Sequence, residues 1–276
     1  MLRPAGGAAD RPSAANLVTD RARRRAAAQG TRRITVSGPM ASGRLAAGPA
    51  TGRPVLTGRG LVKRYGDHRA LAGVDIGISA GEVLAIVGPS GSGKTTLLHV
   101  LAGVLRPDDG EVVLDGHRVD RLGESKRSEL RRREFGFVFQ NGMLVAELTA
   151  EENTALPLLL AGANRQRAMA GAREWLGRLG LAGMETRRPG ELSGGQAQRV
   201  AIARALAHQP KVIFADEPTG ALDTRTGEET MSALLGAAAS TGAAVVVVTH
   251  DRDLAARAGR IVEIRDGRIA DGVVAA

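Results

Sequence analysis

Apolar residues fall into short unbroken runs along most of the chain. Runs of this length, each closed by glycine or polar residues, predict strands that are buried on both faces. Helical stretches between them favour a mostly parallel sheet, and therefore an α/β fold. We expect a helix from Lys94 to Leu101. Four such apolar runs are GEVLAIVG (81–88), EFGFVFQ (134–140), KVIFADE (211–217) and AAVVVVTH (243–250).

The remaining segments show other patterns. Residues 107–119 (PDDGEVVLDGHRV) predict a turn, a strand, a turn and a second strand. Residues from about 145 to 190 are expected to be mostly helical. Residues 1–56 are rich in Ala, Gly, Arg and Pro without a sustained period, which predicts disorder, with order beginning near Leu61. Breaks in the helical region are expected at Pro157, Gly162 and Pro189.

Charge and composition narrow the class of protein. The chain has 276 residues and a net charge of +9, and residues 1–60 carry all of this excess because their acids are only Asp10 and Asp20. There is no cysteine, which excludes disulfides and cysteine-ligated zinc. No apolar run approaches the roughly 20 residues of a membrane span, and no apolar signal segment follows the start. Any membrane crossing is therefore expected on another chain.

A phosphate-binding motif lies between the strand at 81–88 and the helix that follows it. GPSGSGKT (88–95) fits G-x-x-x-x-G-K-[ST]. Its glycines let backbone N–H groups turn towards phosphates at a helix start, Lys94 can reach the β- and γ-phosphates, and the Thr95 hydroxyl can bind Mg²⁺. The alternative is a glycine-rich turn that binds nothing, which the matching strand and helix make unfavourable.

Polar residues close three of the apolar strands. KVIFADE ends in Asp216, placed to hold Mg²⁺, and Glu217, placed to polarise an attacking water. Gln140 ends the strand before it and His250 ends the strand after it. Sites in parallel sheets gather at the carboxyl ends of strands, so these side chains are expected to converge. Ordinary solvated strand ends and a structural histidine are the alternatives.

Two glycines open a further helix at LSGGQAQRVAIARAL (192–206). Ser193 and Gln196 fit a capping box, which does not by itself require Gly194 and Gly195. Bare backbone at a helix start is an anion site. The second site could bind another ligand or close on the same nucleotide from its other side, and the residues alone leave both open.

These motifs, with ALD (221–223) and in this order, make residues 57–276 resemble the nucleotide-binding subunit of an ATP-binding cassette transporter. The resemblance implies a P-loop NTPase core with an antiparallel β subdomain and a helical signature subdomain at about 141–195. It also implies an ATPase that uses ATP and Mg²⁺, in which two copies face head to tail and the signature glycines of one contact the γ-phosphate bound by the other.

The resemblance also implies a role for each residue of the motifs. Catalysis is assigned to Glu217 and His250, metal binding to Thr95, Gln140 and Asp216, and dimer communication to Asp223. The signature residues acting in trans are Ser193, Gly194, Gly195 and Gln196, and the ATP-binding residues are Tyr65 (stacked on adenine), Gly88, Pro89, Ser90, Gly91, Ser92, Gly93, Lys94, Thr95 and Thr96.

A finer resemblance lies in residues 135–162 and in EPTGALD (217–223), which are similar to cassettes of the lipoprotein-release and macrolide-export type. It implies a separate membrane permease, of the export or mechanotransmission kind, docked near Gln140 and residues 141–153 at the cytoplasmic face of the inner membrane. Gly142 and Ala146 depart from the aromatic residue and proline common there. The alternative is a regulatory cassette whose permease transports nothing and controls cell-envelope enzymes. Soluble ABC ATPases of ribosomes or DNA are disfavoured, because neither a second cassette nor a long coiled-coil insertion is visible.

The arginine-rich segment 1–56 is expected to be dispensable for ATP hydrolysis. Three interpretations of this segment are open. It could result from the choice of start codon, since a chain that begins at Met40 keeps every motif. It could instead be a targeting segment, or a polybasic anchor for anionic lipid. We favour disorder without a catalytic role, with weak anionic-lipid contact as a by-product and no specific nucleic-acid binding.

Overall fold

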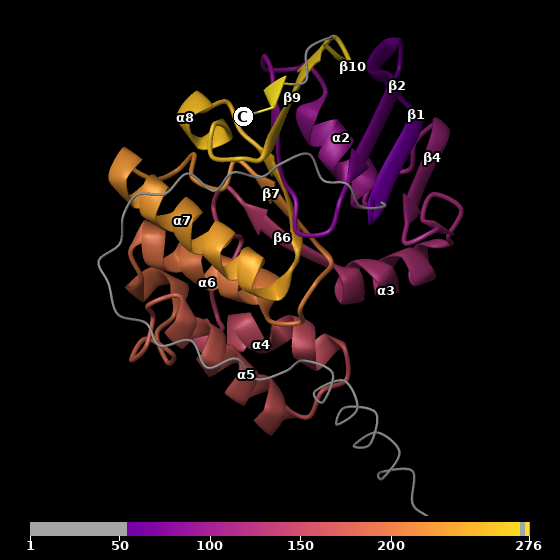
Figure 1. Ribbon diagram of the computed structural model, residues 1–276. Coiled ribbons are helices and arrows are strands. Elements are labelled where there is room, and N and C mark those ends of the chain that lie inside the picture. Colours follow the sequence, from indigo (N-terminus) through magenta and orange to yellow (C-terminus); the bar gives the residue numbers. More distant parts are fainter. Residues whose placement is uncertain (1–53, 271–273, 276) are drawn as a thin grey trace, which may run out of the picture. The chain divides into compact units, whose positions relative to one another are not determined.

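The computed structural model describes residues 54–270 and 274–275 (Figure 1). Its larger sheet is built on five parallel strands in the order β9-β3-β8-β7-β6, and β10 and β11 each pair antiparallel with β9. The expected parallel sheet is confirmed. Its strands are β3 (Val83–Val87), β6 (Phe135–Phe139), β7 (Val212–Asp216), β8 (Ala244–Val248), β9 (Arg260–Arg265), β10 (Arg268–Ile269) and β11 (Val274–Ala275).

A second sheet is antiparallel and has the order β2-β1-β4-β5. It confirms the antiparallel subdomain and the two strands expected at 107–119. The first strand begins at Leu56, a little before the expected start of order at Leu61, because Leu56 is fully buried and pairs with both Ile78 and Leu114. The strands are β1 (Leu56–Tyr65), β2 (His68–Ile78), β4 (Asp109–Leu114) and β5 (His117–Arg118).

Helices cover the parallel sheet on both faces (Figure 1). Helix α2 packs between the antiparallel sheet and strands β7 and β8, whereas α6 packs on β6 together with α4, α5 and α7. The predicted helix at Lys94–Leu101 is confirmed as α2. The others are α3 (Glu124–Glu134), α4 (Ala150–Leu160), α5 (Arg165–Arg178), the 3-10 turn η1 (Pro189–Glu191), α6 (Gly194–Leu206), α7 (Thr224–Thr241) and α8 (Arg252–Ala255).

Two hydrophobic cores lie on opposite faces of the parallel sheet. Alternate residues of each strand supply them: Phe214 and Val246 join the core shared with α2 and the antiparallel sheet, while Ile213 and Val245 join the core under α5, α6 and α7. The continuous apolar pattern of these strands therefore reflects burial on both sides. As a consequence, α2 and α6 belong to different faces.

The helical region differs from expectation at one proline. Helix α4 continues through Pro157 and ends at Leu160, so the predicted break there is wrong, while the chain does leave the helix around Gly162. A proline removes one helix donor. Here the capping box between Thr149 and Glu152 holds the helix start, and packing against α5 and α6 supports the rest. At Pro189 the chain forms a short 3-10 turn.

None of the helices within residues 54–270 combines the length and the apolar character needed to cross a bilayer. The predictions of disorder and lipid contact for residues 1–56 fall on residues outside the described part, except for the last three. Helix α3 was not predicted, because its sequence is almost entirely charged and only Arg127 on it is buried.

Candidate functional site

The P-loop, residues 88–95, is a tight turn between β3 and α2. A Cβ atom on Gly88 would lie 2.1 Å from the Ile264 carbonyl oxygen, and one on Gly93 would lie 2.2 Å from that of Ala70. Both residues have positive φ angles, 146° and 106°. Only glycine combines these φ angles with such close backbone contacts. The fold of the turn itself therefore requires Gly88 and Gly93.

Side chains of the P-loop fit a polyphosphate. Lys94 Nζ donates to the carbonyl oxygens of Gly88 and Pro89 at 2.9 and 2.8 Å, which folds its ammonium over the turn. The hydroxyl of Ser92 is buried and has no hydrogen-bond partner among the described residues. A buried polar group normally has a partner. The turn therefore combines a cation, a hydroxyl in need of a partner and the N-terminus of α2, which together suit phosphate oxygens.

A hydroxyl and a carboxylate meet at the edge of the P-loop. Thr95 Oγ1 donates to Asp216 Oδ1 at 3.4 Å. Burial raises the pKa of the Asp216 carboxyl above its usual value, while the nearby His99 and the bond from Thr95 act in the opposite direction. No group of three acidic, histidine or cysteine side chains within the described residues could hold a metal alone. Mg²⁺ is commonly held by one or two carboxylates together with substrate phosphates, so the pair fits that mode.

Glu217 and His250 contact each other directly. His250 Nδ1 lies 2.7 Å from Glu217 Oε2, and the histidine is largely exposed whereas the glutamate is 25% exposed. Glu217 has a φ of 49°, a left-handed conformation that is uncommon outside glycine. Its N–H donates to the Val248 carbonyl at 2.9 Å, which ties it to the end of β8. Such backbone strain is concentrated at functional sites.

Strand register brings the predicted polar residues to one edge of the sheet. Phe139, Asp216 and Val248 are aligned across β6, β7 and β8, so the residues that follow them leave the sheet at the same level. Gln140 lies over Gly220, where an added Cβ would meet Gln140 Nε2 at 2.9 Å. The convergence that the sequence predicted is therefore present in the geometry.

Tyr65 lies at the end of β1 and is 50% exposed. It lines a pocket of about 260 Å³ that it shares with the P-loop, so the structure brings it beside Lys94, Thr95 and Thr96. His68 lines the same pocket and was not predicted. The sequence offered one signal for it: His68 follows Tyr65 after only two residues. In the structure the two pair across the β1–β2 turn.

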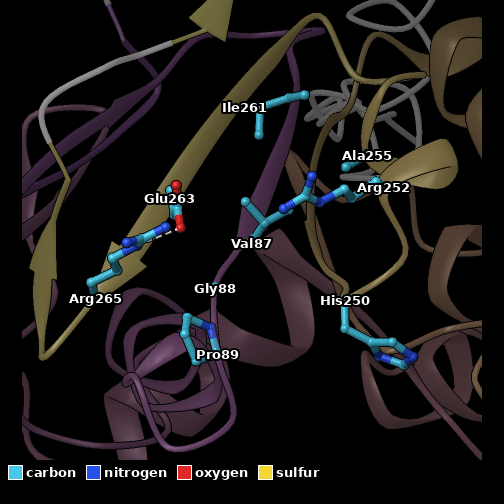
Figure 2. A pocket seen from close by; sticks show the side chains of 9 residues that line it. All are labelled: Val87, Gly88, Pro89, His250, Arg252, Ala255, Ile261, Glu263 and Arg265. Carbon is cyan, nitrogen blue, oxygen red and sulfur yellow. Dashed lines mark hydrogen bonds and ion pairs between the residues drawn. The ribbon is translucent and has the colours of Figure 1, made fainter.

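A larger cavity of about 560 Å³ adjoins the start of the P-loop (Figure 2). Val87, Ile261 and Ala255 supply apolar walls. Figure 2 shows His250 and Arg252 on one side of it and the ion pair of Glu263 with Arg265 on the other. His250 therefore lines this cavity and also contacts Glu217 at the end of β7.

The signature turn, residues 193–196, has a capping box in which Ser193 and Gln196 bond each other's backbone. Gly194 is exposed, but Gly195 is buried, and a Cβ on it would lie 2.3 Å from Thr226 Cγ2 on α7. One of the two glycines is thus needed for close packing of α6 on α7. Among residues 54–270, no hydrogen bond joins the signature turn to the P-loop.

Asp223 caps helix α7, because its side chain accepts a hydrogen bond from the Thr226 N–H at 3.0 Å. The same backbone bond lowers the pKa of the Asp223 carboxyl. Asp223 also lines a pocket of about 270 Å³ with Glu217 and His250. The structure therefore places Asp223 near the strand ends that carry Glu217 and His250.

Comparison with known proteins gives consistent matches. The ABC transporter family matches residues 71–220. The macrolide export ATP-binding/permease protein MacB of Nitrosomonas europaea is 49% identical over 226 residues, covering 80% of this chain and 34% of that protein. The lipoprotein-releasing system ATP-binding protein LolD of Geobacter metallireducens is 46% identical, covering 76% of this chain and 95% of LolD. The chain thus spans about a third of the first relative and nearly all of the second.

Solved structures match the same part of the chain. An ATP-binding cassette solved as a dimer in a post-hydrolysis state, bound to ADP and Pi, has a TM-score of 0.72 and 38% identity, covering 80% of this chain and 98% of that one. A dimeric bacterial ABC transporter cassette has a TM-score of 0.73 and 39% identity with the same coverage. With its P-loop, its converging strand ends and its signature turn, the chain belongs to the ABC transporter family, as an ATP-hydrolysing cassette similar to those of LolD and MacB.

Proposed function

We propose that the chain dimerises head to tail around two ATP molecules and drives a membrane permease of the export or mechanotransmission type. The observation that carries this proposal is that the nucleotide-binding residues and the signature turn lie on different parts of the cassette. The P-loop, Asp216, Glu217 and His250 share one edge, while the signature turn starts a helix on the other face of the sheet. A complete site then needs the signature turn of a second copy.

In this proposal ATP lies along the P-loop. The triphosphate is bound by the backbone and side chains of residues 88–96, with Lys94 leaving the carbonyls it contacts to reach the β- and γ-phosphates. Tyr65 stacks on the adenine, which its exposure and shared pocket support. Thr95, Asp216 and Gln140 hold Mg²⁺, which when bound neutralises charge on the phosphate oxygens.

Hydrolysis needs a group that accepts a proton from water. Glu217 is placed for this role, one residue beyond Asp216 and fixed to β8 by its N–H. The proton passes from the attacking water to a Glu217 carboxylate oxygen as the water oxygen bonds the γ-phosphorus, while the bond from that phosphorus to the bridging oxygen breaks and ADP leaves with the electron pair. His250, bonded to the same carboxylate, orients it and can contact the γ-phosphate. Positioning and charge stabilisation supply most of the rate.

The dimer is supported by the solved relatives, which are dimeric cassettes. The exposed backbone of Ser193 and Gly194 at the start of α6 would meet the partner's γ-phosphate, because a helix N-terminus favours an anion. Gln196 and Gly195 hold this turn in place. Asp223 borders the pocket of Glu217 and His250. In the dimer it would therefore transmit a conformational change at one ATP site to the other ATP site.

A groove of about 550 Å³ is a suitable docking place for the permease. Phe137, Phe139 and Leu160 line it, and Arg131 and Arg132 border it. Met143 and Leu160 are each 65% exposed and line the same groove, so exposed apolar surface gathers there. MacB is named as a macrolide export ATP-binding/permease protein, and LolD as the ATP-binding protein of a lipoprotein-releasing system. The cassette would then sit at the cytoplasmic face of the inner membrane through this groove.

The test is the variant Glu217→Gln. It should bind ATP with unchanged affinity, since the P-loop is untouched, and hydrolyse it at least about 100-fold more slowly, because the amide does not accept the proton. Size-exclusion chromatography with ATP and Mg²⁺ should show an accumulated dimer. Near-normal turnover would remove Glu217 from the role of base, and a monomer at saturating ATP would contradict the head-to-tail dimer.

A further inference from the structure

One buried amide connects three functional segments. Gln198 lies one turn into α6, two residues after the signature turn, and is 2% exposed. Its Nε2 donates to the Phe139 carbonyl at 2.8 Å and to the Pro218 carbonyl at 2.6 Å. Both hydrogens of the amide are therefore used by backbone atoms on other segments.

The two carbonyls belong to residues beside the reacting groups. Phe139 ends β6 and precedes Gln140, and Pro218 follows Glu217. The ladder between β6 and β7 ends at the pair of Phe139 with Asp216. Beyond that pair the two segments leave the sheet, so the Gln198 amide continues the connection between them after the backbone ladder stops.

Helix α6 holds the segment after Gln140 at further points. Arg204 donates to the carbonyls of Gly142 and Met143 at 2.6 and 2.7 Å. The Arg204 guanidinium is partly shielded from water where it makes these two bonds, and this burial lowers its pKa. A Cβ on Gly142 would lie 3.3 Å from Gln198 Oε1, which leaves little free space between the loop and the amide.

We propose that Gln198 is a positioning residue for hydrolysis: by bonding the Phe139 and Pro218 carbonyls, it fixes Gln140 and Glu217 relative to each other and to the signature helix. This inference rests on the proposed function of Glu217. It also provides a mechanical link, because a displacement of residues 141–148 by a docked permease would reach the Pro218 segment through one side chain.

The chemistry of the amide makes the role specific. Replacing it with an apolar side chain leaves the buried Pro218 carbonyl without its donor. The Phe139 carbonyl loses one donor and keeps the Gly142 N–H at 3.0 Å. The Pro218 segment is then free to shift relative to the end of β6. A displacement of about 1 Å at a catalytic group can reduce a rate about 100-fold. ATP affinity should change little, because Gln198 contacts neither the P-loop nor Tyr65.

The experiment compares Gln198→Met, which keeps the length and volume, with Gln198→Asn, which keeps an amide that is too short to reach both carbonyls. We expect kcat to fall by about 10- to 100-fold in Gln198→Met and by less in Gln198→Asn. KM for ATP should stay within about two-fold of the wild type. Thermal unfolding and calorimetric ATP titration of each variant show the folded fraction and the affinity.

Thr154→Val is the matched control. Thr154 is fully buried in the same helical region, but its hydroxyl bonds only the Ala150 carbonyl of its own helix. It should lose stability while keeping kcat. If both Gln198 variants fold and keep the kcat of this control, or if both fail to fold, the positioning role is overturned. A wild-type protein without ATPase activity would instead overturn the proposed function itself.

Discussion

At the scale of single residues, the site depends on backbone positions that neighbouring strands impose. Glu217 takes a left-handed conformation directly after β7, and its N–H is fixed by the Val248 carbonyl of β8. The strain of such a conformation persists only where the surroundings determine it. The carboxylate is thereby directed to His250 rather than into solvent.

His208 gives a prediction on pH dependence. Its Nε2 is 2.9 Å from the Phe135 carbonyl, and its buried Nδ1 has no partner in residues 54–270. Burial lowers the pKa of this imidazole below 6.5 in the folded state. Between 6.5 and that lower value the unfolded chain binds a proton that the folded chain does not, so stability must fall as the pH decreases through this window.

The comparison is between wild type and His208→Gln, which does not titrate. Lowering the pH from 7.5 to 5.5 should reduce the free energy of unfolding of the wild type more than that of the variant, by at most about 1.4 kcal/mol, the limit set by one pH unit below 6.5. Urea unfolding at the two pH values measures the difference. An equal loss in both proteins would show that His208 does not contribute.

At the scale of elements, α6 is the helix that most of the site depends on. Its first turn is the proposed partner-facing surface, its second turn holds Gln198, and its third bonds Gly142 and Met143 through Arg204. Close packing on α7 sets the position of all three. Gly195 lies where α6 packs tightly on α7, because an added Cβ would lie 2.3 Å from Thr226 Cγ2.

We therefore expect Gly195→Ala to destabilise the protein by roughly 1–3 kcal/mol, the usual effect of overpacking. Thr226→Ser in the same chain should restore part of this loss, because it removes the methyl group in contact. Gly194→Ala should have a smaller effect, because its Cβ would meet only the end of the Leu222 side chain, at 3.2 Å. Chemical unfolding without nucleotide measures all of these variants. Equal losses at the two glycines would contradict the packing explanation.

Elements with a strong pattern were predictable from the sequence, and those held by tertiary contacts were not. Strands β3, β6, β7 and β8 and helix α2 follow from continuous apolar runs and a glycine motif, whereas β9 (Arg260–Arg265), with charged residues in its sequence, was not predicted. Helix α3 did not, because its charged residues pair with each other, as Glu124 does with Arg131, and its one apolar residue, Leu130, gives no hydrophobic pattern. Pro157 suggested a break, but packing of α4 outweighed one lost bond.

The residues of the candidate site also differ in whether the sequence could predict them. Strand-end residues such as Asp216 and His250 could be grouped by sequence, because parallel strands end at a common edge. Gln198 could not, since nothing in the sequence relates a helix residue to carbonyls that lie 59 and 20 positions away. The buried state of Gly195 was likewise invisible, and the sequence alone attributed both glycines to a ligand.

At the scale of the whole molecule, the cassette is predicted to work without its arginine-rich beginning. A chain starting at Met40 contains every motif of the site. Its kcat should equal that of the full chain, while its binding to anionic vesicles should be weaker and less salt-sensitive, since each basic residue near such a surface contributes about 1 kcal/mol. Paired ATPase and vesicle-sedimentation assays measure both. A collapse of ATPase activity would make the segment part of the enzyme.

The most direct test of the central claim, that each site is completed by a second copy, is complementation between two inactive variants. Lys94→Ala removes the side-chain cation of the P-loop. Gly194→Asp places a carboxylate at an exposed helix start, which the helix itself tolerates but which would repel a partner's γ-phosphate. Each variant alone should lack ATPase activity.

In an equal mixture, half of the randomly formed dimers contain one copy of each variant, and each of these has one intact site. The account predicts a recovery of up to about a quarter of wild-type ATPase activity. A mixture no more active than its two parents, with both variants folded, would contradict it.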